Sequence, residues 1–91
     1  GIMDKKELTE KVKEWIKASL SDVKTVSELN DDTPLIAEDG ESGVFDNSLC
    51  VLEVTSGLVT EFEVDPSIFK KESFKNVSTL VDTIEEALNK K

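Results

Sequence analysis

Residues 48–62 read Ser-Leu-Cys-Val-Leu-Glu-Val-Thr-Ser-Gly-Leu-Val-Thr-Glu-Phe, and this stretch does most to decide the fold. At 100° per residue its apolar side chains gather on one side of a helix, and no alternating strand pattern competes. The residues on this side are Val51, Leu52, Val54, Leu58, Val59 and Phe62. Leu49 falls instead on the polar face beside Glu53, so an exposed leucine is expected there. We predict a helix from Ser48 to Phe62.

Three further helices are predicted around this stretch. The first runs from about Asp4 to Leu20, and its apolar face holds Leu8, Val12, Trp15, Ile16 and Ser19. Asp65-Pro66 is a favourable N-cap followed by proline, and it opens a short helix carrying Ile68 and Phe69. The last helix is capped by Asn76 or Ser78, and its apolar stripe is Val77, Leu80, Val81, Ile84 and Leu88.

Residues 21–47 lack sustained periodicity and contain Pro34, Gly40 and Gly43, which predicts a long loop. Leu35 and Ile36 are expected to pin this loop to the core. The sequence of 91 residues is the size of one small domain. The predicted fold is therefore a single all-α domain over residues 1–91. It is a four-helix bundle of three longer helices and one short one, with a long loop between the first and second helices.

The charge of the chain is concentrated in its middle. The formal net charge is −9, and residues 25–69 contain no basic residue. Eleven acidic residues lie in this block: Glu28, Asp31, Asp32, Glu38, Asp39, Glu41, Asp46, Glu53, Glu61, Glu63 and Asp65. Such a block is either a solvated surface kept for solubility or a docking surface for basic partners. It disfavours binding to nucleic acid and to anionic membrane surfaces.

The composition excludes several kinds of site. The chain has no histidine and one cysteine, so it lacks a histidine general base, an internal disulfide and a multi-cysteine zinc site. The spacing of acids counted from Asp31 or Asp39 does not match a calcium-binding EF-hand loop. We expect no catalytic residues and no metal. With no apolar run long enough to span a bilayer and no visible signal peptide, we expect no stable membrane insertion and a cytoplasmic location.

The junction between the loop and the second predicted helix reads Asp46-Asn47-Ser48-Leu49. A serine at this position is commonly a helix N-cap. It is also an accessible hydroxyl at which an attached phosphodiester would be favoured by free backbone N–H groups and the helix dipole.

These residues resemble the acyl carrier proteins, small acidic four-helix bundles that carry acyl groups on a 4′-phosphopantetheine arm. In that family the arm is attached to the serine of an Asp-Ser-Leu motif, and Ser48 and Leu49 match its last two positions. Glu53 matches a glutamate of the family's second helix, and Glu61-Phe62 match the end of that helix. Residues 65–74 and 77–84 resemble the family's third-helix region and the start of its last helix, so the resemblance covers essentially the whole chain.

The chain departs from the family pattern at several positions. Asn47 stands where an aspartate usually precedes the serine, Val44-Phe45 replace the usual Leu-Gly, and Cys50 occupies a position that is commonly acidic. Val59 and Thr60 stand where acidic residues usually dock partner synthases. These departures favour a dedicated pathway over ordinary fatty-acid synthesis.

The resemblance implies a non-catalytic carrier whose Ser48 holds 4′-phosphopantetheine derived from coenzyme A. It also implies docking through Asp46, Asn47, Leu49 and Glu53. The expected partners are a phosphopantetheinyl transferase and the acyl-loading and acyl-transferring enzymes of fatty-acid, lipid or polyketide biosynthesis, which would have basic docking surfaces. We expect a monomer. Gly57 is then either a close helix–helix contact or space for a sequestered acyl chain.

Three alternatives remain open at this point. The carrier could hold aminoacyl groups. The chain could be a small acidic helical interaction domain without a prosthetic group. It could also be a carrier-like protein that has lost its modification site, as Asn47 would suggest.

Overall fold

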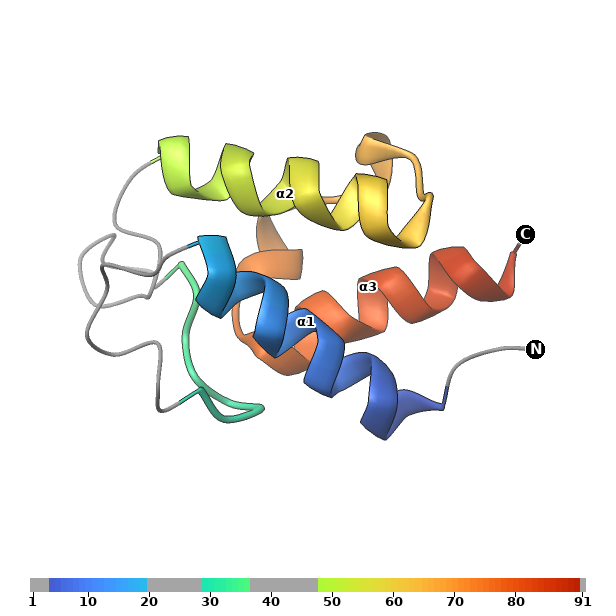
Figure 1. The fold of residues 1–91 in the computed structure, drawn as a ribbon, viewed down its shortest axis with the longest axis horizontal. Coiled ribbons are helices and arrows are strands. Elements are labelled where there is room, and N and C mark those ends of the chain that lie inside the picture. The colour runs from blue at the N-terminus through green and yellow to red at the C-terminus, as the bar shows by residue number, and fades with distance from the viewer. Residues whose placement is uncertain (1–3, 20–28, 37–47, 91) are drawn as a thin grey trace.

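The computed structural model describes residues 4–19, 29–36 and 48–90, and the described chain is all-α (Figure 1). Its elements are α1 (Lys5–Ser19), α2 (Ser48–Phe62), the 3₁₀ turns η2 (Pro66–Ile68) and η3 (Lys71–Phe74), and α3 (Val77–Asn89). Helix α1 packs against both α2 and α3, η2 contacts both α2 and α3, and η3 packs against α3. The described residues form no strand, and their β-type pairing is one isolated bridge between Pro34 and Asn76.

Helix α1 begins one residue later than predicted, because Asp4 caps it from outside. The Asp4 Oδ1 atom accepts hydrogen bonds from the backbone N–H groups of Lys6 and Glu7, at 2.8 and 3.4 Å. Its buried face is the predicted one: Leu8, Val12 and Ile16 are fully buried, and Trp15 packs half-buried beside them. Leu20 and the side chain of Ser19 lie outside the described residues.

Helix α2 has the predicted bounds, but one part of its predicted apolar face is wrong. Val54, Leu58 and Phe62 are buried, whereas Leu52 is 62 % exposed. At 100° per residue Leu52 lies about 120° around the helix from Leu58, which places it beyond the edge of the buried arc. The covered side of α2 is therefore narrower than its apolar side.

Helix α2 ends in a Schellman motif, in which Glu63 takes the left-handed position that glycine usually occupies. Glu63 has a left-handed backbone, with φ of 53°, and the Val64 N–H donates to the Val59 carbonyl at 3.3 Å. Val64, the residue after this left-handed position, is itself buried in the hydrophobic core. The chain is thereby turned back from α2 toward α3.

The connection after α2 is capped by Asp65 as predicted, but two 3₁₀ turns form in place of one short helix. The Ser67 N–H donates to Asp65 Oδ1 at 2.8 Å, and this bond lowers the pKa of the Asp65 carboxyl. The chain makes i→i+3 bonds and then becomes extended at Phe69 and Lys70, which stops further winding. The predicted count of four helices is thus not confirmed.

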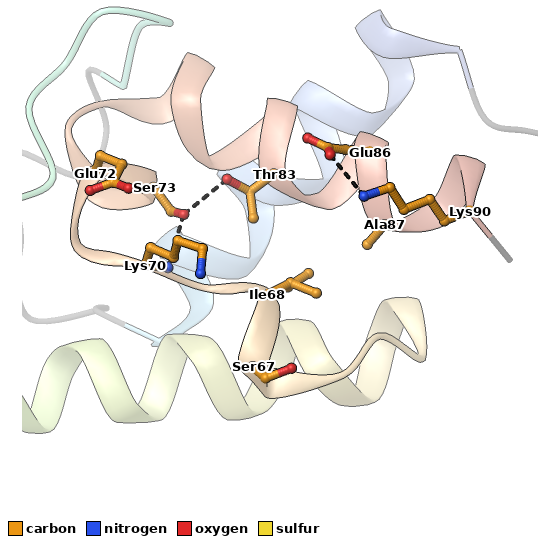
Figure 2. A pocket seen from close by; sticks show the side chains of 9 residues that line it. All are labelled: Ser67, Ile68, Lys70, Glu72, Ser73, Thr83, Glu86, Ala87 and Lys90. Carbon is orange, nitrogen blue, oxygen red and sulfur yellow. Dashed lines mark hydrogen bonds and ion pairs between the residues drawn. The ribbon is translucent and has the colours of Figure 1, made fainter.

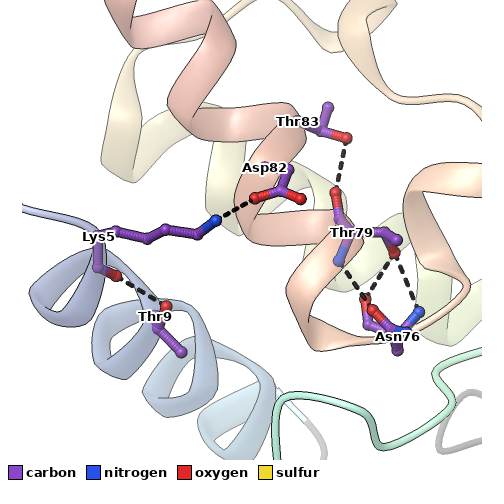
Figure 3. A network of polar contacts seen from close by, with 6 residues as sticks. All are labelled: Lys5, Thr9, Asn76, Thr79, Asp82 and Thr83. Atoms are coloured by element: carbon purple, nitrogen blue, oxygen red, sulfur yellow. Dashed lines mark hydrogen bonds and ion pairs between the residues drawn. The ribbon is translucent and has the colours of Figure 1, made fainter.

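Helix α3 has a complete N-terminal capping box (Figure 3). Asn76 Oδ1 accepts from the Thr79 N–H at 2.8 Å, and Thr79 Oγ1 accepts from the Asn76 N–H at 3.1 Å. Of the two caps suggested by the sequence, Asn76 is the correct one. An exposed ion pair of 2.7 Å joins Lys5 to Asp82 across α1 and α3, and its hydrogen bond raises the pKa of Lys5.

The described part of the predicted loop, residues 29–36, is tied to the bundle. Leu35 is fully buried, as expected, and Ile36 packs against the core. The Ile36 N–H donates to the Phe74 carbonyl at 2.8 Å, and the Ser78 N–H donates to the Asp31 carbonyl at 2.8 Å. The other residues of this predicted loop lie outside the described residues.

Candidate functional site

Ser48 is the first residue of α2, as predicted. The first turn of α2 contains no acidic side chain, so no carboxylate of this turn compensates the positive end of the helix dipole. By contrast, α1 has Asp4 at its cap and Glu7 in its first turn. Asp46, Asn47 and the side chain of Ser48 lie outside the described residues. Within the described residues, the first turn of α2 that follows the candidate serine therefore contains no carboxylate.

Two exposed leucines follow the serine on α2. Leu49 is 60 % exposed and Leu52 is 62 % exposed, and these are the exposed large apolar side chains of the described residues. Residues three apart on a helix are neighbours, so the two side chains lie side by side. Glu53 is exposed as well, four residues after Leu49. The expected exposure of Leu49 is confirmed, and sequence reasoning missed its partner Leu52.

The rest of the exposed face of α2 is polar but uncharged over its middle turns. Ser56 and Thr60 are exposed there, and the Thr60 hydroxyl donates to the Ser56 carbonyl at 3.1 Å. The next charged side chain of α2 after Glu53 is Glu61, which is also exposed. The exposed face thus has an apolar, acid-flanked end near Ser48 and a neutral middle.

The edge of α2 that faces α1 is closed by an aromatic ring. A Cβ atom at Gly57 would lie 2.9 Å from both Cε3 and Cζ3 of Trp15, which is closer than a carbon contact allows. Gly57 is therefore the close helix–helix contact that the sequence allowed. The other expectation was that Gly57 leaves space for a sequestered acyl chain, but the Trp15 ring occupies the space beside it.

Thr55 carries a polar group that sequence reasoning did not single out. Its Oγ1 atom is buried and has no hydrogen-bond partner. Buried hydroxyls are normally paired, because leaving one unpaired sacrifices its hydration without compensation. No sequence signal marks this atom, since threonine in a helix usually donates to the carbonyl four residues earlier.

A pocket of about 360 Å³ lies between the 3₁₀ turns and the second half of α3 (Figure 2). Its polar groups are largely paired with one another. Ser73 Oγ accepts from the Lys70 N–H at 3.1 Å and lies 3.0 Å from Thr83 Oγ1, while Lys90 and Glu86 form an ion pair of 3.0 Å. None of the predicted site residues lines this pocket, and its hydroxyls serve to join η3 to α3.

Metal-binding clusters and membrane-spanning helices are both absent from the described residues. Over residues 4–19, 29–36 and 48–90, no cluster of three or more Cys, Asp or Glu side chains is placed to hold a metal ion. Within the same ranges, no helix combines the length and the apolar character needed to cross a membrane.

Comparison with known proteins gives no relative for this chain. No protein-family model, no curated protein and no solved structure matches it.

Proposed function

We propose that the protein is an acyl-carrier-type protein whose Ser48 is the attachment point of a 4′-phosphopantetheine arm. The observation that carries the proposal is the arrangement at the start of α2. Ser48 opens the helix, Leu49 next to it is 60 % exposed, and Glu53 lies exposed one turn further on. A serine that opens a helix and is followed by an exposed apolar side chain and an exposed carboxylate suits a site that partner enzymes must repeatedly recognise and release.

The chain's own contribution to such chemistry is positioning and electrostatics. The arm would supply the thiol that holds an acyl group as a thioester. The first turn of α2, which contains no acidic side chain, would favour the negative charge of a phosphodiester on Ser48 through its backbone N–H groups. No catalytic residue is needed, because loading and transfer would be carried out by the partner enzymes.

The proposed partners are a phosphopantetheinyl transferase and acyl-loading and acyl-transferring enzymes with basic docking surfaces. Leu49 and Leu52 would enter an apolar pocket of the partner enzyme. Glu53, together with Asp46 and Asn47 before the serine, would orient the partner on this surface. Because Val59 and Thr60 supply no charge, the pathway would be a specialised branch of fatty-acid, lipid or polyketide biosynthesis. The proposal includes a monomer in the cytoplasm, with η2 and η3 standing for the short helix of a four-helix bundle.

A second candidate is a small acidic interaction domain without a prosthetic group. The exposed pair of Leu49 and Leu52 supports it, since such a pair can anchor a protein partner without an arm. A carrier for aminoacyl groups would have the same attachment chemistry with a different cargo. A carrier-like protein that has lost its modification site would retain the helices but not the reaction at Ser48.

The test is modification by coenzyme A and a broad-specificity phosphopantetheinyl transferase, followed by intact mass measurement. The proposal predicts a gain of one phosphopantetheine on the wild type and no gain on Ser48→Ala. An unchanged wild-type mass, or a gain that persists in Ser48→Ala, would reject Ser48 as the site and favour the interaction domain or the lost-site carrier.

A further inference from the structure

Thr55 differs from the other threonines in the described helices. Its Oγ1 atom is buried without a hydrogen-bond partner. The hydroxyls of Thr9, Thr60 and Thr83 each donate to the carbonyl four residues earlier, at 2.7, 3.1 and 2.9 Å, and that of Thr79 donates to a carbonyl at 2.9 Å. The bond that satisfies a helical threonine is thus made elsewhere in this chain but not at Thr55. An unpaired buried hydroxyl is rare in a native fold and is free to accept a hydrogen bond from, or donate one to, a group that binds there.

Thr55 lies on the same side of α2 as Ser48. Seven residues at 100° per residue return to within about 20° of the starting direction, and they advance about 10 Å along the helix axis. Leu52 and Val59 are its neighbours at three residues before and four residues after. Gly57, which faces the Trp15 ring, lies about 160° away around the helix. Thr55 is therefore on the edge of α2 that α1 leaves uncovered, two turns beyond the candidate attachment residue.

Two neighbours of Thr55 on α2 lie outside the fully buried core. Leu52 is 62 % exposed, so its side chain can change rotamer with little loss of packing. Val59 is only partly buried against the core. A chain that lies along this edge of α2 would lie against Leu52 and Val59, neither of which is fully buried.

We infer that the Thr55 hydroxyl donates a hydrogen bond to an amide carbonyl of the phosphopantetheine arm when the arm lies along α2. The inference rests on the proposed function, and it names the residue that positions the arm. The arm has two secondary amides, which is the kind of acceptor an unpaired hydroxyl needs. Thr55 is a positioning residue and takes no part in the transfer itself.

The test compares thermal unfolding midpoints before and after loading with the unacylated arm from coenzyme A, with loading verified by intact mass. Thr55→Val removes the hydroxyl at nearly constant shape, Thr55→Ser keeps it, and Thr60→Val is the matched control on the exposed face. Loading is expected to raise the midpoint of the wild type, Thr55→Ser and Thr60→Val by similar amounts. The gain in Thr55→Val should be less than half of the wild-type gain.

The outcomes separate this inference from the proposed function. If the wild type gains no mass, the proposed function fails and the inference fails with it. If all variants are loaded but loading raises the unfolding midpoint of Thr55→Val as much as that of the wild type, the inference is overturned. Ser48 then remains the proposed attachment site. An independent readout is the methyl resonance of Thr55, whose shift on loading should exceed that of Thr60; equal shifts would also overturn it.

Discussion

Helices α2 and α3 have similar lengths but different relations to the rest of the molecule. Helix α3 starts with a full capping box, and its buried stripe is Val77, Leu80, Val81 and Ile84. Helix α2 exposes Leu49 and Leu52, leaves the Thr55 hydroxyl unpaired and has a glycine at its centre. Of these features, the buried unpaired hydroxyl of Thr55 costs stability, because its lost hydration is not replaced by a hydrogen bond. Helix α3 thus has a capped and buried stripe, whereas α2 has an exposed apolar end, and under the proposed function that end contacts partner enzymes.

The largest effect that tests this contrast is truncation of a buried residue in α3. Ile84 is fully buried, and Ile84→Ala should lower the free energy of unfolding by about 2–5 kcal/mol through lost burial and a cavity. Leu52→Ala, which shortens an exposed leucine of α2, should change it by less than about 0.5 kcal/mol. Urea denaturation measures both. A loss of several kcal/mol in Leu52→Ala would mean that Leu52 belongs to the core.

The contact between Gly57 and Trp15 provides the next effect. Gly57→Ala should destabilise the protein by up to about 2 kcal/mol, because an overpacking cost of about 1–3 kcal/mol against the ring outweighs the gain of about 1 kcal/mol in helix propensity. Trp15 is the one tryptophan of the chain, so its fluorescence reports the displaced ring directly. Ser56→Ala, at the neighbouring exposed position, is the matched control and should leave the emission unchanged. A stabilised Gly57→Ala would show that the two helices are not in close contact.

The cap of α3 is expected to matter less than the core but measurably. Asn76→Ala removes the side-chain acceptor of the Thr79 N–H and should cost about 1 kcal/mol. Asn76→Asp keeps an acceptor oxygen and should retain most of that stability. The two thermal unfolding midpoints separate the variants, and equal midpoints would mean that the cap contributes nothing.

The exposed end of α2 should affect recognition rather than stability. Leu49→Ala should slow modification by the transferase about fivefold, equivalent to about 1 kcal/mol of transition-state stabilisation. Glu53→Gln should slow it as well and make the rate less sensitive to added salt, because a steering charge is lost. Initial rates at two salt concentrations measure this. Unaltered rates in both variants would show that the transferase does not dock on this face of α2.

The smallest effect concerns Asp65 in the turn after α2. Its pKa is lower in the folded protein, because the Ser67 N–H donates to the carboxylate. The stabilisation is therefore fully present above the ordinary aspartate pKa of about 3.9 and is lost as the pH falls through the lower folded value. The advantage of the wild type over Asp65→Asn in urea denaturation should shrink across that range. A difference independent of pH would contradict this assignment.

Much of the fold could be predicted because local patterns decide it. The bounds of α2, the buried stripe of α3 and the Asp65 cap follow from apolar spacing and from capping side chains that act within one turn. The exposure of Leu52 was mispredicted, because the apolar pattern does not reveal how wide an arc the neighbouring elements cover. The two 3₁₀ turns depend on where the chain must extend to reach α3, which a local pattern does not encode.

The candidate site was predicted in part. Leu49 and Glu53 are exposed where the helical periodicity placed them, and Ser48 begins α2. Asp46 and Asn47 stay predictions, since they lie outside the described residues. The unpaired state of Thr55 could not be predicted, because it depends on the rotamer of one hydroxyl and on what surrounds it.

The central claim is that Ser48 carries a phosphopantetheine arm loaded with cargo. The most direct measurement is fragmentation mass spectrometry of the Ser48-containing peptide from protein isolated out of the cells that produce it. The account predicts this peptide with one phosphopantetheine on Ser48, a fraction of it bearing an acyl thioester that hydroxylamine removes. A peptide found only with an unmodified Ser48 would contradict the account.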